Sequence, residues 1–158
     1  MNVAHATNAA PAVDELEIVA FHVGDWLVGI DIQQIQEIRR HFDLTPVPLA
    51  PAHVRGVVNV QGEILTVVDL RTVLGAGETA LGRSTSNLIV RSGGESIGVL
   101  AERVADVVRT SRQDLDEVPA NLRGAHRRFF RGVYRLEDEV LFLLDIDEAL
   151  NTRTPPLN

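Results

Sequence analysis

The apolar positions of this 158-residue chain recur in two long stretches that match each other without a gap. Residues 55–74 and 131–150 are identical at seven of twenty aligned positions, and most other positions exchange one aliphatic residue for another. Average amino-acid usage predicts about one identity by chance. The chain therefore contains an internal repeat.

Each copy of the repeat has the pattern of a β-hairpin. A polar turn, at residues 61–63 in the first copy and 137–139 in the second, separates two apolar segments. The second segment is continuously apolar, at residues 64–68 and 140–144, so both faces of each strand are predicted to be covered. These two strands are therefore expected at the centre of a common core.

An aspartate follows each of these apolar segments and is predicted to begin a short helix. The carboxylates of Asp69 and Asp145 can accept hydrogen bonds from the free backbone N–H groups of a first helical turn. Asp145 is also followed three positions later by Glu148, which is the pattern of a capping box.

The chain opens with a further hairpin signal. Residues 16–23 and 26–31 are apolar runs separated by Gly24-Asp25, a strong indication of a tight turn. Isoleucines then recur at every third position, which predicts a short helical turn with Glu37 facing outward. These isoleucines are Ile32, Ile35 and Ile38. Prolines at positions 46, 48 and 51 end any regular element that follows.

The second half of the chain opens in the same way, with apolar runs on either side of a Gly93-Gly94 turn. Placing Gly29 on Gly98 brings further similar residues into register: Ile30/Val99, Ile35/Val104, Glu37/Asp106 and Ile38/Val107. The repeat therefore covers half-domains, at about residues 16–74 and 87–150, joined by a glycine-rich linker at residues 75–86. About four or five short strands per half, with little helix, predict small β-barrels.

Length and composition fit one compact domain, which we place at residues 15–151. Residues 1–14 lack apolar periodicity and are predicted to be a disordered tail, and residues 152–158 a C-terminal tail. The chain has no cysteine, no apolar run near the ~20 residues needed to cross a bilayer, and no secretory leader pattern. We therefore expect a cytoplasmic protein.

The net charge of −7 argues against nucleic-acid binding. The basic residues are all arginines, and five of them cluster at residues 123–135, interleaved with Phe129, Phe130 and Tyr134. Such a cluster could resemble a cationic and aromatic platform for RNA. The aromatic residues adjoin a predicted strand, however, so they are expected to pack inward.

No catalytic or metal-binding pattern is present. The five histidines lack metal-ligand spacing, the absence of lysine excludes a P-loop, and no serine has the G-x-S-x-G context. Asp69 and Asp145 lack the Asp-Thr/Ser-Gly context of acid proteases. The sequence therefore predicts a protein without enzymatic activity, metal or cofactor.

Several motifs in this chain occur in the order and spacing of one known family. They are Gly-Ile-Asp-Ile and Ile-Gln-Glu-Ile-Arg within residues 29–39, Pro48-x-x-Pro51, Arg-Gly-Val-Val-Asn-Val-Gln-Gly at residues 55–62, Val-Val-Asp-Leu-Arg at residues 67–71 and Leu-Asp-Ile-Asp at residues 144–147. With them the chain resembles the CheW family of chemotaxis coupling proteins, from about residue 16 to residue 150.

The resemblance implies an all-β fold with a few short helices, in which two intertwined five-stranded SH3-like β-barrels share a hydrophobic core. It also implies a scaffold that couples the cytoplasmic tip of a methyl-accepting chemoreceptor to the homologous regulatory domain of the histidine kinase CheA. Such an adaptor would lie at receptor arrays on the inner face of the membrane and would meet the membrane only through receptors.

Candidate contact residues follow from the same resemblance. Those assigned to the kinase are Ile35, Glu37, Ile38, Gly56 and Gln61, and those assigned to the receptor or to the turn are Asn59 and Val58. Gln61 stands where the family usually has arginine, and a glutamine offers only neutral hydrogen bonds. The isoleucines could instead belong to the core, Gly56 to the start of a strand with positive φ, and Asn59 to a turn.

Two other functions stay open on sequence grounds. One is a self-assembling structural β-barrel of a related array, because homologous barrels offer similar faces to one another. The other is a small nucleic-acid-binding barrel that uses the arginine cluster at residues 123–135. The sequence does not identify which chemosensory pathway the adaptor would serve.

Overall fold

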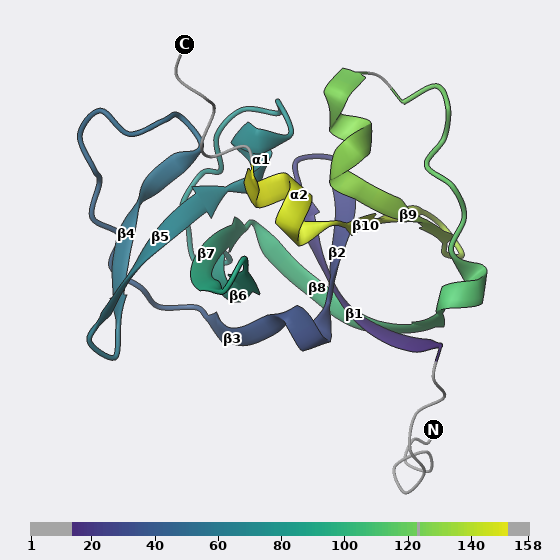
Figure 1. The fold of residues 1–158 in the computed structure, drawn as a ribbon, viewed down its shortest axis with the longest axis horizontal. Helices are drawn as coiled ribbons and strands as arrows, with labels where there is room; N and C mark the ends of the chain where they lie inside the picture. Colours follow the sequence, from purple (N-terminus) through teal and green to yellow (C-terminus); the bar gives the residue numbers. More distant parts are fainter. Residues whose placement is uncertain (1–13, 123, 152–158) are drawn as a thin grey trace, which may run out of the picture.

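The computed structural model describes residues 14–122 and 124–151 and consists of two five-stranded sheets with a few short helices (Figure 1). Sheet A is ordered β8 (Arg103–Ser111), β1 (Glu15–Val23), β2 (Trp26–Asp31), β10 (Val140–Leu144) and β9 (Phe130–Arg135). Sheet B is ordered β3 (Ile35–Arg39), β6 (Ser86–Ser92), β7 (Glu95–Ala101), β5 (Glu63–Asp69) and β4 (Val54–Val60). The predicted tails lie outside the described residues, apart from Asp14.

The two halves of the chain exchange strands between the sheets. Sheet A holds β1 and β2 from the first half and β8, β9 and β10 from the second. Sheet B holds β6 and β7 from the second half and β3, β4 and β5 from the first. Replacing each strand by its repeat equivalent converts one strand order into the other, and both sheets contain one parallel pair, β2–β10 and β5–β7. The predicted intertwined all-β fold is therefore confirmed.

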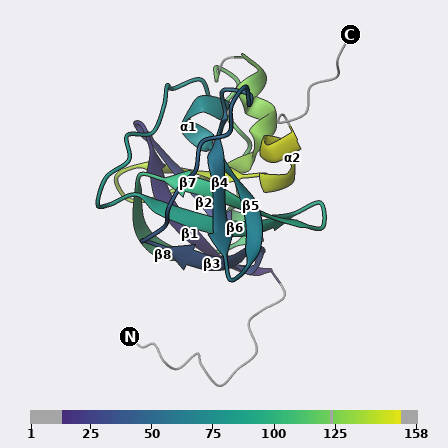
Figure 2. The same ribbon diagram turned by 90° about the vertical axis from the view of Figure 1, so that its left-hand side faces the viewer.

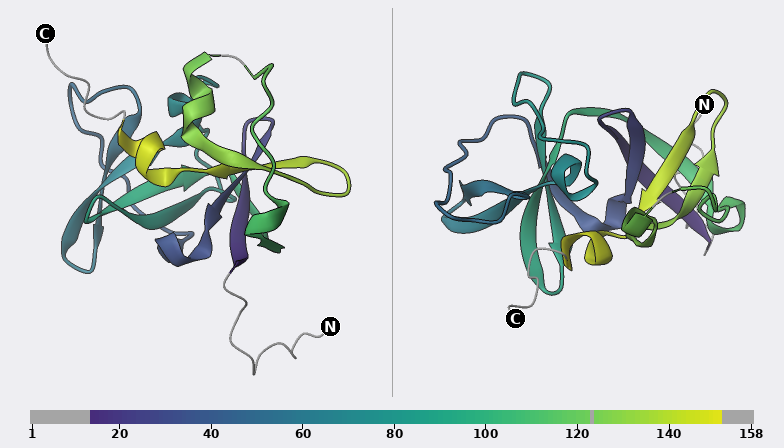
Figure 3. Two further views of the ribbon diagram at one scale, coloured as in Figure 1. Left: turned by 45° about the vertical axis from the view of Figure 1, so that its right-hand side comes forward. Right: turned by 90° about the horizontal axis from the view of Figure 1, so that it is seen from above.

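Two short α-helices lie between the two sheets (Figure 3). They are α1 (Leu70–Val73) and α2 (Ile146–Leu150), and the described 3-10 helices are η2 (Ile32–Gln34), η3 (Arg112–Asp114) and η4 (Gly124–Phe129). Asp69 Oδ1 accepts from the N–H of Arg71, and Asp145 Oδ1 accepts from the N–H of Glu148, both at 3.1 Å. Both predicted helix caps are thus present.

Only one of the two hydrogen bonds of the capping box predicted at α2 is present. The N–H of Asp145 donates to the carbonyl oxygen of Phe129 at 2.7 Å, rather than to the side chain of Glu148. The neighbouring η4 therefore takes the role that a glutamate side chain has in a complete capping box.

The helical turn predicted from the spacing of Ile32, Ile35 and Ile38 is wrong beyond its first residues. Only η2 is helical, and Asp31 caps it by accepting from the N–H of Gln33 at 3.0 Å. The chain then becomes extended at Ile35, because pairing of β3 with β6 satisfies its backbone groups. A period of three over so few residues does not distinguish a helical turn from the start of a strand.

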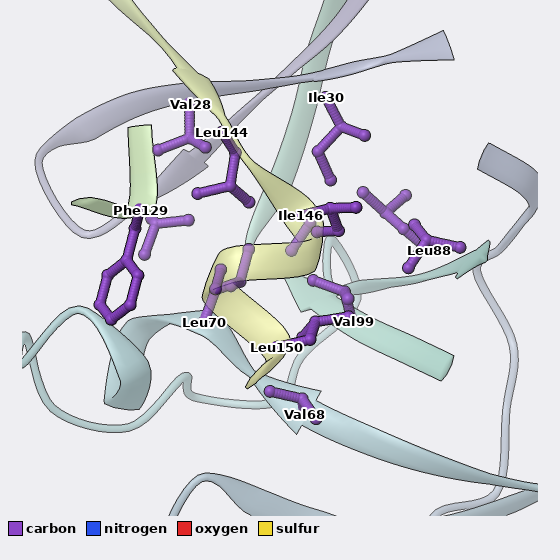
Figure 4. Close-up of a cluster of buried hydrophobic side chains, with 14 of the residues drawn as sticks. Val28, Ile30, Val68, Leu70, Leu88, Val99, Phe129, Leu144, Ile146 and Leu150 are labelled. Carbon is purple, nitrogen blue, oxygen red and sulfur yellow. The ribbon is translucent and has the colours of Figure 1, made fainter. Parts of the chain in front are cut away.

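A single core joins the two sheets (Figure 4). Its side chains come from sheet A, from sheet B and from both α-helices, and include Val28, Ile30, Leu144, Val68, Leu88, Val99, Leu70, Ile146 and Leu150. Each sheet also has a smaller core of its own, which contains Leu143 in sheet A and Leu65 in sheet B. The predicted common core is therefore confirmed.

The prediction that both apolar strands are covered along their whole length is wrong at their first residues. Ile64 is 61% exposed and Val140 is 38% exposed, although the residues that follow them are mostly buried. Both residues lie beside a hairpin turn, where the strand extends past the layer that covers it.

The linker after α1 is fixed to sheet B by a buried carboxylate. Asp69 accepts hydrogen bonds from Nη1 of Arg55 at 2.7 Å, from the N–H of Thr79 at 2.8 Å and from the hydroxyl of Thr79 at 2.7 Å. Because Asp69 has no exposed surface, these donors replace the water that the carboxylate loses on burial.

Candidate functional site

A groove of about 940 Å³ lies on sheet B. Figure 2 shows the side of the molecule on which β3, β4 and β5 of this sheet face the viewer. Its walls come from β3, from the turn between β4 and β5, and from the turn between β6 and β7. β3 and β4 are the two edges of the sheet, so the curvature of the sheet is what brings them to one groove. The groove is lined by Gln36, Glu37, Val60, Gln61, Glu63, Ile64, Leu65, Thr66, Ile89, Arg91, Gly94, Glu95, Ser96 and Ile97.

The groove combines an acidic rim with an exposed aliphatic side chain. Its charged lining residues are the three carboxylates of Glu37, Glu63 and Glu95, and Arg91. Ile64 is the most exposed aliphatic residue of the lining. A surface of this kind suits a protein partner that brings basic and apolar side chains, because both kinds of group are already presented to solvent.

Two of the sequence-predicted contact residues, Glu37 and Gln61, line the groove together. The side chain of Glu37 is 40% exposed, and its Oε2 lies 2.8 Å from Nε of Arg39 on the same strand. Next to it, Oε1 of Gln36 accepts from the hydroxyl of Ser96 at 2.7 Å, which ties β3 to β7. The ion pair with Arg39 and the hydrogen bond of the neighbouring Gln36 therefore both help to hold Glu37 in position on β3.

Gln61 occupies the first position of a tight turn and has a positive φ of 53°, followed by Gly62 with a φ of 90°. The N–H of Gly62 donates to Oδ1 of Asn59 at 2.9 Å. Asparagine suits this place because its short side chain can bond the backbone of a turn. The structure thus gives Asn59 a role in the turn that presents Gln61 to the groove.

The two predicted isoleucines on β3 differ in their surroundings. Ile35 is partly buried and packs against the shared core. Ile38 is exposed at the other end of the strand, outside the residues that line the groove. Of the pair, only Ile38 presents an apolar surface that a partner could cover.

Gly56 and Val58 have positions that the fold itself explains. Val58 is 3% exposed and belongs to the core of sheet B, so its side chain is not on the surface. Gly56 has a φ of 149°, and a Cβ placed on it would lie 2.3 Å from the carbonyl oxygen of Thr45. That carbonyl accepts from the N–H of Val57 at 2.8 Å, so the close approach is part of the pairing between the loop and β4.

Sequence reasoning missed Ile64 and the contribution of the turn between β6 and β7. Ile64 is the first residue of a continuous apolar segment, and nothing in that segment of the sequence indicates that its first residue is exposed. Arg91, Glu95 and Ser96 flank a predicted turn, but only the pairing of β3 with β6 shows that this turn lies beside β3. No short sequence pattern carries that information.

The described part of the arginine cluster does not form an aromatic platform for RNA. Phe129, Phe130 and Tyr134 are all buried, and burial raises the pKa of Tyr134. Arg135 pairs with Asp116 at 3.1 Å. Because stacking on bases needs exposed aromatic faces, these residues lack the surface that the nucleic-acid interpretation requires.

Within residues 14–122 and 124–151, no cluster of three or more histidine, aspartate or glutamate side chains is placed to hold a metal ion. None of the helices in that part of the chain has the length and apolar character needed to cross a bilayer.

The chain is similar to proteins of one family over most of its length. The family model described as CheW-like domain matches residues 17–154. The chemotaxis protein CheW of Rhizobium meliloti is 33% identical over 147 residues, which cover 90% of this chain and 94% of that protein. Protein FrzA of Myxococcus xanthus is also 33% identical over 147 residues, which cover 91% of each chain. The crystal structure of the scaffolding protein TtCheW from Thermoanaerobacter tengcongensis has the same fold, with a TM-score of 0.79 at 21% identity and coverage of 94% of this chain and 92% of that one.

Proposed function

Since this chain belongs to the CheW family, a family of non-enzymatic chemotaxis scaffolds, we propose that it binds the regulatory domain of CheA through the groove on sheet B. The same molecule then binds the cytoplasmic tip of a methyl-accepting chemoreceptor. Holding the two partners in one geometry lets a change of receptor state alter the free energy of kinase binding. The chain itself supplies an adaptor rather than a reaction.

The observation that carries this proposal is the meeting of Glu37 and Gln61 in one groove, from elements at opposite edges of sheet B. Exposed Ile64 adds an apolar contact to the same groove. Gly56 supports the kinase site indirectly, because its close approach to Thr45 fixes the start of β4. Ile38 extends the same face along β3, whereas Ile35 belongs mainly to the core.

We place the receptor contact at Asn59, which is exposed on β4 and lies outside the residues that line the groove, so that both partners can bind at once. Val58 is left out of this contact because its side chain is buried. Binding to receptor tips would place the protein at receptor arrays on the inner face of the membrane, with receptors as its only link to the bilayer.

Reversal of charge at Glu37 tests the kinase face. Glu37→Arg is expected to weaken binding of the cognate CheA regulatory domain by about 1–2 kcal/mol, because it places a positive charge on an acidic rim that faces the partner. The measurement is calorimetric titration of the purified kinase domain with each variant. Unchanged affinity would remove this rim from the interface.

The loss of the ion pair between Glu37 and Arg39 needs a matched control. The double variant with Glu37→Arg and Arg39→Glu keeps opposite charges on the strand but exchanges their places, so it is expected to restore thermal stability without restoring affinity.

In the same titration, Gln61→Arg is expected to strengthen binding by roughly 1 kcal/mol, since a guanidinium can make charge-assisted hydrogen bonds. Weaker binding would instead indicate a partner that is matched to glutamine.

A further inference from the structure

Asn87 is a buried polar side chain beside the smaller core of sheet B. It has no exposed surface, and neither its Oδ1 nor its Nδ2 has a hydrogen-bond partner among the described residues. It lies on the same face of β6 as Ile89, which belongs to that core. A buried amide without a partner lowers stability, because the hydrogen bonds to water that it loses on folding are not replaced. A native fold that keeps such a group needs a reason for it.

The repeat shows that an apolar side chain fits at this position. The strands pair alike when Gly29 is placed on Gly98, and Ile18 of β1 is then the equivalent of residue 87. A Cβ added to Gly29 would lie 2.3 Å from Cγ2 of Ile18. A Cβ added to Gly98 would lie 2.4 Å from Oδ1 of Asn87. The room beside the two glycines is therefore alike, and the shape of the fold does not require an asparagine.

The residue opposite Asn87 differs between the sheets in the same way. Asn87 pairs with Arg39 of β3 in sheet B. The equivalent Ile18 pairs with Val108 of β8 in sheet A. One sheet thus has an apolar cross-strand pair where the other has a polar pair. Residues directly opposite each other have Cβ atoms about 4.5–5.5 Å apart on one face. A change of rotamer therefore brings the guanidinium of Arg39 to the amide of Asn87.

Arg39 contacts Glu37 in this structure instead. Its Nε lies 2.8 Å from Oε2 of Glu37, but the N–H is not directed at that oxygen, so Nε is buried without a hydrogen bond. The contact is an ion pair between side chains that are 30% and 40% exposed, and ion pairs with such access to solvent are weak. Arg39 thus lies between a carboxylate that lines the groove and an amide on the neighbouring strand that has no partner.

We propose that Asn87 is a positioning residue of the kinase groove, which accepts the guanidinium of Arg39 when a basic group of the partner binds Glu37. The inference rests on the kinase contact proposed for Glu37. A partner arginine or lysine at the rim repels Arg39 and competes with it for the carboxylate. A charge-assisted hydrogen bond from Arg39 to Oδ1 of Asn87 then replaces the lost ion pair. Asn87 therefore destabilises the free protein and stabilises the complex.

Asn87→Ile tests both effects in the full chain. It is expected to raise the melting temperature by about 3 °C or more, because the residue found at the equivalent position replaces an amide without a partner. It is also expected to weaken binding of the cognate CheA regulatory domain about threefold to tenfold in calorimetric titration, through the lost hydrogen bond. If neither Asn87→Ile nor the smaller Asn87→Val raises the melting temperature, the amide is satisfied in the free chain and the proposal is overturned. Unchanged affinity of both variants overturns it as well.

A double-mutant cycle with Arg39→Met shows whether Asn87 acts through Arg39. Methionine keeps an unbranched stem over Asn87 but cannot pair with Glu37, so this variant is expected to bind the kinase domain at least as tightly as wild type. In the Arg39→Met background, Asn87→Ile is expected to change the affinity less than about twofold. An equal loss of affinity in both backgrounds would show that the substitution acts through the fold alone, and it would overturn the proposal.

Glu37→Arg separates a failure of this inference from a failure of the kinase groove. If Glu37→Arg leaves the affinity unchanged, the rim is outside the interface and both proposals fail. If Glu37→Arg weakens binding while Asn87→Ile does not, the groove stays the kinase site and only the role of Asn87 is wrong. Weaker binding in both variants, with the loss from Asn87→Ile confined to chains that contain Arg39, supports both.

Discussion

Gly56 illustrates how one residue can serve a binding face without touching a partner. Its φ of 149° and the 2.3 Å that would separate an added Cβ from the oxygen of Thr45 both exclude a side chain. The pairing of Thr45 with Val57 depends on that close approach. A substitution at this glycine would therefore act first on the loop before β4, and only through it on the groove.

Gly56→Ala is expected to destabilise the fold by roughly 1–3 kcal/mol, the usual cost of strained backbone, and by more if the loop is displaced. Gly82→Ala is the control, because a Cβ there meets no atom within 4 Å and the residue has no left-handed φ. Chemical denaturation of both variants measures the difference. Wild-type stability for Gly56→Ala, combined with loss of kinase binding, would instead make Gly56 a direct contact.

Asp69 and Asp145 occupy equivalent positions of the repeat but differ in their burial and in their hydrogen-bond partners. Both cap a helix, as the sequence predicts. Asp69 is also completely buried and holds Arg55 and Thr79, whereas the carboxylate of Asp145 is partly exposed and lies 3.9 Å from Arg131. The difference arises from Thr79 in the linker, which donates two of the hydrogen bonds to Asp69, whereas no described residue takes that place beside Asp145. Sequence comparison of the two copies alone therefore could not predict it.

Among the elements, β5 and β10 connect the small core of each sheet to the shared core. Leu65→Ala and Leu143→Ala are each expected to cost about 2–5 kcal/mol, as for other buried leucines. Ile64→Ala, on the same strand as Leu65 but exposed, is expected to cost less than about 1 kcal/mol. Denaturant midpoints and slopes of the three variants provide the comparison. Equal effects at Leu65 and Ile64 would mean that the two faces of β5 are wrongly assigned.

Local patterns predicted most elements because each carried a physical signal of its own. Tight turns such as Gly93-Gly94 need residues that accept positive φ, and the caps of α1 and α2 need a side-chain acceptor. β3 was misread because its isoleucines recur at a spacing that also fits a helical turn. Exposure of Ile64 and Val140 was invisible because burial at the end of a strand depends on which distant layer covers it.

The candidate site was predictable only in part for the same reason. Glu37 and Gln61 came from the family resemblance, and their shared groove depends on the curvature of sheet B. Residues gathered by topology rather than by spacing are the ones that sequence reasoning cannot place.

At the scale of the whole molecule, strand exchange makes the two sheets depend on each other. Each sheet takes two strands from one half of the chain and three from the other, and the shared core includes both α-helices. An adaptor benefits from this construction, because the groove on sheet B is then held in one fixed relation to sheet A. A rigid body can transmit a change in position from one partner to another, whereas two freely hinged barrels could not.

Division of the chain within the linker tests this dependence. Fragments of residues 1–81 and 82–158 are each expected to lack a cooperative unfolding transition, since neither contains all strands of a sheet. Mixed together, they are expected to form a 1:1 complex whose circular dichroism matches the intact chain and whose unfolding midpoint rises with concentration. Light scattering distinguishes this complex from a dimer of one fragment with its own copy. The repeat permits such a dimer, but we expect it to be weaker than the 1:1 complex because the core residues of the two halves differ. A fragment that unfolds cooperatively as a monomer would show that one half completes a barrel without the other.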